Sequence, residues 1–274
     1  YWEIRYQKNN LNEDEMQRQI IVGLKKSLEY CLGGNKSKGV FLSGGIDSSA
    51  LVALMRDLGC ASIETFSAIF KEKDFNESTN SSLIARHFNT KHHQVLIDAK
   101  RALIPLGGIF SRLDEPLADA SVMPTYLVAS LAQKEGMNVC ISGDGGDELF
   151  GGYDTYSALR FLKYASGMPS LLKNIFNQAA NLLPVKSYRG LNFKLKKFIE
   201  GINLAPEIAY YTWWGAYTLI EQKKLFTEEL NNALGAYDPL RVIDLYKDEC
   251  KGLHFLNKVF YMDLKFNLCD GSLR

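Results

Sequence analysis

The chain has 274 residues, of which 46% are hydrophobic, and this length and composition are enough for one full hydrophobic core or two. Its formal net charge of +1 excludes a strong field that would attract nucleic acid or a membrane surface. Five cysteines without a Cys-x-x-Cys pair predict free thiols in a reducing, cytoplasmic setting, and no signal peptide or transmembrane segment is visible.

The first expected element is a helix that begins after Asn12. Asn12 can cap this helix, and Glu15 lies three residues further on, in the capping-box position. An apolar stripe then follows at helical spacing through Met16, Ile20, Leu24 and Leu28. Residues 38–43 are predicted to form a strand and residues 46–58 a helix.

A glycine turn joins this strand to this helix. The apolar run Gly39-Val40-Phe41-Leu42 stops at Ser43-Gly44-Gly45, and the helical pattern follows at once. Such a junction directs free N–H groups and the positive end of a helix at one point, which is an anion site, and Ser48 can add a hydroxyl donor. The Asp47 carboxylate would repel bound phosphate unless a cation lay between them, so the turn predicts magnesium as well as phosphate. The spacing fits neither a Walker A loop nor the dinucleotide fingerprint, and an ordinary capped turn is the alternative.

Strands and helices alternate over the next hundred residues. Strands are expected at 62–70, 91–98 and 138–142, and helices at 77–88, 99–110 and 124–134. This order implies right-handed crossovers and a parallel sheet covered by helices on both faces. Ligands of such sheets bind at the carboxyl ends of the strands, and Ser43, Ser67 and Ser142 lie near such ends. His92-His93 has no metal-ligand spacing and is expected to belong to a strand.

A second glycine-rich turn follows residues 138–142. The string Ser142-Gly143-Asp144-Gly145-Gly146-Asp147-Glu148 places three carboxylates within five positions, where they repel one another. Structural turns commonly carry one or two Asp or Gly residues, so a cation or a cationic substrate group explains three acids better. Residues 161–274 show helical spacing, in which Lys186 to Lys197 is interpreted as a solvated helix face and Tyr210 to Trp214 as core or interface packing.

These strings resemble a known family. The loop at 43–49 is similar to the pyrophosphate loop of the ATP-pyrophosphatase superfamily, and the strings at 142–153 and 113–127 resemble the asparagine synthetase family, as does the opening Tyr1-Trp2-Glu3-Ile4. The resemblance implies an α/β fold of the adenine nucleotide alpha hydrolase-like, ATP-pyrophosphatase type. It implies a linker and N-terminal helix over 1–34, a nucleotide-binding domain over 35–160, and a helical region over 161–274 that is truncated relative to the family.

The activity that the resemblance implies is that of an ATP-dependent ligase with ATP and Mg²⁺ as cofactors. It would adenylate the side-chain carboxylate of aspartate and transfer ammonia to it, giving asparagine, AMP and pyrophosphate. Contacts with ATP or pyrophosphate are implied for Leu42, Ser43, Gly44, Gly45, Asp47, Ser48, Ala68, Ser142 and Gly143. Magnesium ligation is implied for Asp47 and Asp147, and catalysis for Asp144 together with Asp47. Asp119 and Glu148 are weaker substrate candidates, and Glu148 is equally well explained as a helix-start carboxylate.

Departures from the family leave alternatives open. The sequence from Tyr1 onward does not contain the glutaminase domain of glutamine-dependent members, so ammonia is expected from such a domain on the full-length chain or on a separate subunit. The family's lysine-containing run beyond Leu268 is absent, and Ala68 and Ala120 stand where some members carry larger residues. A β-lactam synthetase-like or sugar-amidating enzyme and a non-catalytic nucleotide-binding remnant are the alternatives. The expected partners are small molecules, with a homodimer allowed and neither nucleic acid nor membrane.

Overall fold

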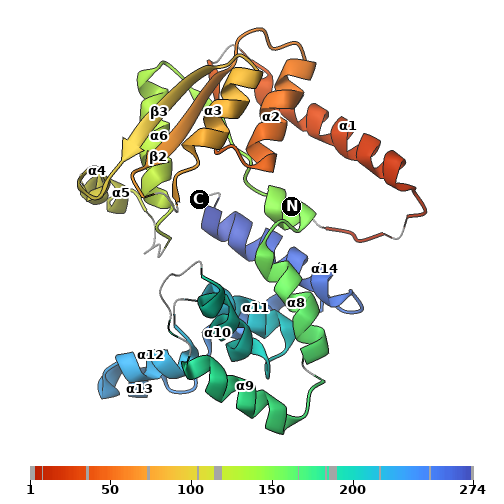
Figure 1. Ribbon diagram of the computed structural model, residues 1–274, viewed down its shortest axis with the longest axis vertical. Coiled ribbons are helices and arrows are strands. Elements are labelled where there is room, and N and C mark those ends of the chain that lie inside the picture. Colours follow the sequence, from red (N-terminus) through yellow and green to blue (C-terminus); the bar gives the residue numbers. More distant parts are fainter. Residues whose placement is uncertain are drawn as a thin grey trace. The chain divides into compact units, whose positions relative to one another are not determined.

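The computed structural model describes the chain apart from residues 1–3, 8, 35–36, 73–74, 104, 114–118, 166, 183, 185–189, 216, 247 and 273–274. It divides into two compact units, Tyr1–Asp144 and Gly145–Arg274, which are called the sheet unit and the helical unit below (Figure 1). This division falls earlier in the chain than the boundary at residue 160 that the sequence suggests. It assigns Asp144 to the sheet unit, and Asp147 and Glu148 to the helical unit.

The sheet unit has the expected order of elements. Its strands are β1 (Lys38–Phe41), β2 (Glu64–Phe70), β3 (Lys91–Ile97) and β4 (Val139–Ile141), and its helices are α1 (Glu13–Leu32), α2 (Ile46–Asp57), α3 (Ser78–His87), α4 (Ala99–Leu103), α5 (Leu106–Phe110) and α6 (Val122–Lys134). The single helix expected over 99–110 is wrong, because two short helices occupy this range. Pro105 is the N-cap of the second helix, and a proline, which lacks an N–H, is tolerated at a helix start but not in its interior.

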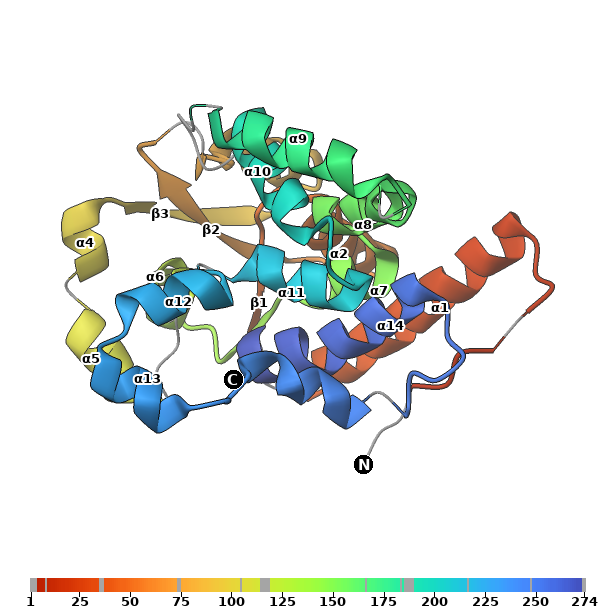
Figure 2. The ribbon, with the colours of Figure 1, turned by 90° about the horizontal axis from the view of Figure 1, so that it is seen from below.

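The four strands are parallel and lie in the order β3-β2-β1-β4. Figure 2 labels β1, β2 and β3 of this sheet. Phe41 of β1 pairs with Phe66 of β2, and Val40 of β1 pairs with Ile141 of β4. The predicted parallel sheet is therefore confirmed. Because β1 lies between β2 and β4, the turns that leave β1 and β4 emerge side by side at the same edge of the sheet.

Helices cover both faces of this sheet, as predicted. On one face Val52 of α2 packs in a core with Val40 and Leu42, and Leu28 of α1 belongs to the same core. On the other face α6 packs against Phe66 of β2. Burial of each such side chain stabilises the fold by about 1.5–3 kcal/mol.

The N-terminal helix α1 keeps its predicted cap but only part of its predicted packing. Oδ1 of Asn12 accepts a hydrogen bond from the N–H of Glu15 at 2.9 Å. Within the apolar stripe, Leu28 is 3% exposed, whereas Met16 and Ile20 are 39% and 42% exposed. The burial of α1 is therefore concentrated in its C-terminal half.

Arg56 fastens the C-terminal end of α2. Its guanidinium donates five hydrogen bonds of 2.6–2.9 Å to the backbone carbonyls of Cys60, Ala61, Phe88 and Asn89. The planar guanidinium can donate in several directions at once, so one side chain ties the end of α2 to the end of α3.

The helical unit contains helices and no strand among its described residues, which confirms the helical C-terminal region. Its elements are α7 (Gly146–Phe150), α8 (Asp154–Ala165), α9 (Ser170–Leu182), α10 (Leu191–Gly201), α11 (Pro206–Trp214), α12 (Leu219–Leu225), α13 (Glu228–Leu234), the 3₁₀ segment η2 (Pro239–Tyr246), α14 (Phe255–Met262) and the π-helical segment η3 (Asp263–Ser272). Its core joins α8, α11 and α14 through Leu159, Tyr210 and Val259. The aromatic cluster at 210–214 thus contributes to a core, as expected, although Trp214 is 46% exposed.

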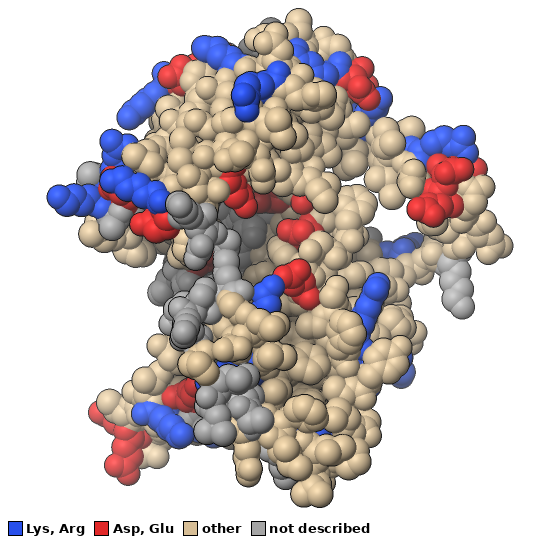
Figure 3. All heavy atoms as spheres, in the orientation of Figure 1, with Lys and Arg blue, Asp and Glu red and all other residues tan. Residues whose placement is uncertain are grey.

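Charged side chains of both signs are spread over the visible surface among large uncharged areas (Figure 3). Of the basic segment Lys186–Lys197, Lys186 and Arg189 lie outside the described residues, while Lys194 pairs with Asp154 at 2.6 Å and Lys197 pairs with Glu200 at 3.1 Å. All five cysteines are free thiols. In the described part of the chain, no helix is both long enough and apolar enough to cross a bilayer.

Candidate active site

Two serine hydroxyls hold the turn between β1 and α2. The Oγ atoms of Ser43 and Ser48 lie 3.0 Å apart, and the N–H of Gly45 donates to Ser43 Oγ at 3.2 Å. The N–H of Gly44 donates to Ser48 Oγ at 3.3 Å. Ser48 is buried and Ser43 is exposed, so Ser48 closes the turn while the hydroxyl of Ser43 can also reach a ligand.

Gly44 lets this turn approach helix α3. Its φ is +89°, and a Cβ at this position would lie 2.5 Å from the backbone N of Ser81 and 2.7 Å from the backbone C of Asn80. Both the left-handed conformation and the lack of space therefore require glycine. The family resemblance implies that this glycine contacts ATP or pyrophosphate, and the structure adds a packing reason that no local pattern contains.

The start of α2 presents unpaired N–H groups at the same turn. Gly45 is the N-cap without a side-chain capping bond, and the first intrahelical hydrogen bond joins the N–H of Ser49 to the carbonyl of Gly45 at 3.1 Å. The N–H groups of the first helical turn precede any possible intrahelical acceptor, and the helix dipole adds positive potential. This arrangement can bind an anion such as a phosphate, and the Asp47 carboxylate lies in the same helical turn.

The turn after β4 packs directly onto the start of α2. A Cβ at Gly143 would lie 3.0 Å from Cβ of Asp47 and 3.2 Å from the backbone N of Ser48. Beside it, Ser142 Oγ donates to Oδ2 of Asp144 at 2.7 Å, and Asp144 is exposed. The structure therefore brings together the predicted residues of both turns within the sheet unit, from Ser43 to Ser48 and from Ser142 to Asp144.

The register of β1 and β2 places Leu42 and Ala68 differently. The N–H of Leu42 donates to the carbonyl of Phe66 at 2.9 Å, and the carbonyl of Leu42 accepts from the buried hydroxyl of Ser67. Only the second lone pair of that carbonyl remains for a nucleoside. In a parallel ladder successive residues bond alternately to the two sides, so Ala68, two residues beyond Phe66, directs its N–H and carbonyl to the side where β1 has ended. Ala68 is therefore the better placed of the two for a backbone contact.

The remaining candidates have structural partners of their own. Asp119 accepts from the N–H and Oγ of Ser121 at 2.8 and 2.6 Å, just before α6. In the helical unit, Glu148 is 2% exposed and accepts from the hydroxyl of Tyr153 at 2.8 Å. Asp147 lies in the first turn of α7. The substrate roles of Asp119 and Glu148 and the magnesium role of Asp147 stay predictions.

Asp263 is a buried acid that belongs to none of the sequence motifs described above. It is 0% exposed and accepts hydrogen bonds from the hydroxyls of Tyr156 at 2.5 Å, Tyr211 at 3.4 Å, and Tyr210. Burial raises its pKa to about 6. The sequence feature that could have pointed to Asp263 is its position as a single aspartate directly after the apolar, aromatic helix at 255–262. The tyrosines at 156, 210 and 211 precede it in the chain.

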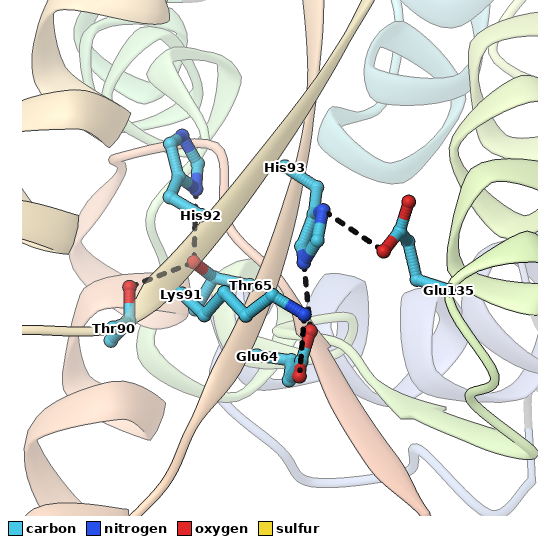
Figure 4. Close-up of polar contacts among 7 residues, drawn as sticks. All are labelled: Glu64, Thr65, Thr90, Lys91, His92, His93 and Glu135. Atoms are coloured by element: carbon cyan, nitrogen blue, oxygen red, sulfur yellow. Dashed lines mark hydrogen bonds and ion pairs between the residues drawn. The ribbon is translucent and has the colours of Figure 1, made fainter.

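The His92-His93 pair lies in β3, as expected, and its two rings have different contact partners (Figure 4). Nε2 of His93 lies 2.7 Å from Glu64, and its Nδ1 lies 3.6 Å from Glu135. His92 Nδ1 lies 2.9 Å from the hydroxyl of Thr65, and burial lowers the pKa of His92. These contacts tie β3 to β2 and to the end of α6.

No group of three or more His, Cys, Asp or Glu side chains among the described residues has the geometry of a metal site. The donor set at the α2 start nevertheless fits a magnesium–phosphate pair, because N–H groups, a serine hydroxyl and the Asp47 carboxylate adjoin one turn. A hollow of about 540 Å³ lies on the α6 face of the sheet, and Arg112, Tyr126, Gln133, Phe41 and Cys140 contribute to its lining.

Residues 22–273 match the asparagine synthase family, and the chain belongs to this family. It is 31% identical over 266 residues to asparagine synthetase [glutamine-hydrolyzing] 1 of Bacillus subtilis, covering 96% of this chain and 40% of that protein. It is 29% identical to putative asparagine synthetase [glutamine-hydrolyzing] 2 of Methanocaldococcus jannaschii, covering 89% of this chain and 48% of that protein.

The chain thus spans less than half the length of these two relatives. Among solved structures, NMN synthetase from Francisella tularensis superposes with a TM-score of 0.34 at 15% identity, covering 91% of this chain and 97% of that chain.

Proposed function

We propose that this chain is the synthetase part of an asparagine synthetase, which activates the side-chain carboxylate of aspartate with ATP and converts it to an amide with ammonia. A carboxylate is a poor electrophile because it is anionic and lacks a good leaving group. Attack of a carboxylate oxygen on the α-phosphorus of ATP forms a P–O bond and expels pyrophosphate. Attack of ammonia on the resulting acyl carbon then forms the C–N bond, expels AMP and releases a proton.

The contact of Gly143 with Asp47 and Ser48 is the observation that carries this proposal. It brings the predicted ATP-binding residues of two turns to one edge of the sheet. The N–H groups of the α2 start and the hydroxyls of Ser43 and Ser48 would hold the departing pyrophosphate. Ala68 would contact the nucleoside through its backbone, and Asp144 would act at the acyl-adenylate. Holding the two reactants in line can supply roughly 7–11 kcal/mol of the barrier.

Magnesium would be held by Asp47 and, on the family resemblance alone, by Asp147. When bound, a magnesium ion neutralises charge on the β- and γ-phosphates of ATP. The position of Asp47 supports this role, because its carboxylate shares a helical turn with the N–H groups proposed to bind phosphate. The expected ammonia source is a glutaminase domain, on a longer form of the chain or on a separate subunit, in the cytoplasm.

The test supplies magnesium, ATP and ammonia with a panel of carboxylic acids and measures AMP and pyrophosphate. AMP formation that depends on aspartate, with asparagine as product, supports the proposal. AMP formation with another acid would instead identify a related adenylating enzyme, as in β-lactam or sugar-amide synthesis. Nucleotide binding without any turnover would identify a non-catalytic remnant.

A further inference from the structure

The segment after α7 folds back onto the acidic residues that begin this helix. The N–H groups of Gly151 and Gly152 both donate to the carbonyl of Asp147, at 2.8 and 3.0 Å. The chain therefore closes a tight loop in which the backbone of residues 151–152 lies directly against Asp147.

Gly152 leaves the space that the Asp147 carboxylate occupies. A Cβ at position 152 would overlap Oδ1 of Asp147 and would lie 3.0 Å from its Cγ. Gly152 is not among the glycines with a positive φ, so an alanine could adopt its backbone conformation. Space for this carboxylate, rather than backbone freedom, is what requires glycine here.

Tyr153 fixes the neighbouring acid from the same loop. Its hydroxyl donates to Oε1 of Glu148 at 2.8 Å. Its ring is held in turn by Trp214, with ring centroids 5.2 Å apart and planes at 78°, and by Tyr156, with centroids 5.5 Å apart. Because Glu148 is 2% exposed and follows Asp147 directly, this hydrogen bond holds the first turn of α7 in place against the aromatic core.

We infer that Gly152 and Tyr153 are positioning residues, which set the direction of the Asp147 carboxylate toward a divalent cation. This inference rests on the proposed function, in which Asp147 is a magnesium ligand. Glu148 then serves to orient α7 rather than to bind substrate. Residues that orient a metal ligand typically change metal affinity or activity by about 10–100-fold when they are altered.

The experiment measures binding of Mn²⁺ with inorganic pyrophosphate by electron paramagnetic resonance, and the Mg²⁺ concentration that gives half-maximal AMP formation. Gly152→Ala should weaken Mn²⁺ binding about tenfold or more and raise the half-maximal Mg²⁺ concentration, with the KM for the acid unchanged. Tyr153→Phe should shift both in the same direction by less. Gly167→Ala is the matched control, because its Cβ would meet only the carbonyl of Tyr164, at 3.6 Å, and it should leave both values unchanged.

A double-mutant cycle separates positioning from general destabilisation. If Gly152 acts through the Asp147 carboxylate, adding Gly152→Ala to Asp147→Ala should cause no further loss of Mn²⁺ binding. Additive losses, or wild-type Mn²⁺ binding by Gly152→Ala, would overturn the inference. If Gly152→Ala lowers the unfolding temperature, the Mn²⁺ affinity of Tyr153→Phe, which adds no atom, tests whether these residues position the carboxylate.

The failure of the proposed function can be distinguished from the failure of this inference. A wild-type chain that forms no AMP and binds no Mn²⁺ refutes both. An active wild-type chain together with an unaffected Gly152→Ala variant refutes the inference alone.

Discussion

Replacing Asp263 by asparagine should change how the stability of the helical unit depends on pH. The carboxylate is fully buried and is hydrogen-bonded by three tyrosine hydroxyls. Burial disfavours its charged form and raises its pKa from 3.8 to about 6. An asparagine retains one oxygen that can accept from these hydroxyls, but it has no proton to lose in this range.

The size and sign of the effect follow from proton linkage. Between pH 4 and pH 6, roughly, the folded chain holds a proton on Asp263 that the unfolded chain has released, so the free energy of unfolding falls as pH rises through this window. The gap between 3.8 and about 6 corresponds, at about 1.36 kcal/mol per pKa unit, to a loss of about 3 kcal/mol. Above pH 6.5 or so the loss is complete and the dependence on this group levels off.

Urea unfolding followed by tryptophan fluorescence would measure this dependence, because Trp213 and Trp214 both lie in the helical unit. Unfolding free energies at several values between pH 4 and pH 7.5 should show the stability of Asp263→Asn, relative to the parent chain, rising by about 3 kcal/mol toward neutral pH. Asp248→Asn, which alters an exposed aspartate of the same unit, is the control. Parallel pH profiles for Asp263→Asn and the parent would refute the reasoning.

Three further substitutions test the sheet unit. Asp47→Ala should abolish pyrophosphate release while leaving the unfolding temperature unchanged, because alanine keeps the Cβ that contacts Gly143; near-normal pyrophosphate exchange would contradict the role of Asp47. Gly44→Ala should weaken pyrophosphate binding in calorimetry and cost about 1–2 kcal/mol for the left-handed backbone alone, with the overlap against Ser81 adding to it; unchanged stability would contradict the packing described here. Arg56→Lys should lower the free energy of unfolding by about 2–3 kcal/mol in chemical denaturation, because a lysine cannot replace five hydrogen bonds made by one guanidinium. A change within about 0.5 kcal/mol would show that water replaces these hydrogen bonds.

Local signals predicted most of the sheet unit because its elements are specified by neighbours in the chain. The cap at Asn12, the strand that stops at the glycines of the first turn, and the alternation that requires a parallel sheet all involve contacts over a few residues or a regular period. The single helix predicted over 99–110 is wrong for a local reason as well: the apolar pattern continues past Pro105, but this proline lacks the N–H that a helix interior requires.

Contacts between distant segments carried no such signal. Gly44 is required because the backbone of Ser81 lies close to it, and Gly143 is required because Asp47 lies close to it. Neither partner can be inferred from the local sequence of the turn. The sequence does not predict that Asp263 is buried among tyrosines of α8 and α11. A single acid after an apolar helix is equally compatible with an exposed position.

The acidic string after β4 shows how such long-range partners alter an electrostatic expectation. Three carboxylates within five positions would need a shared cation if they repelled one another without other compensation. Two of them have hydrogen-bond donors of their own: Asp144 accepts from Ser142, and Glu148 accepts from Tyr153. These hydrogen bonds compensate part of the charge of the string without a cation. In the proposed function the magnesium ligands are Asp47, which shares a helical turn with N–H groups suited to phosphate, and Asp147. The affinity for the metal ion should then depend on Asp47 and Asp147 far more than on Asp144 or Glu148, and a titration of Mn²⁺ against the four single alanine variants would rank them. Equal losses of Mn²⁺ affinity in all four variants would instead indicate that Asp144 and Glu148 contribute to metal binding as much as Asp47 and Asp147 do.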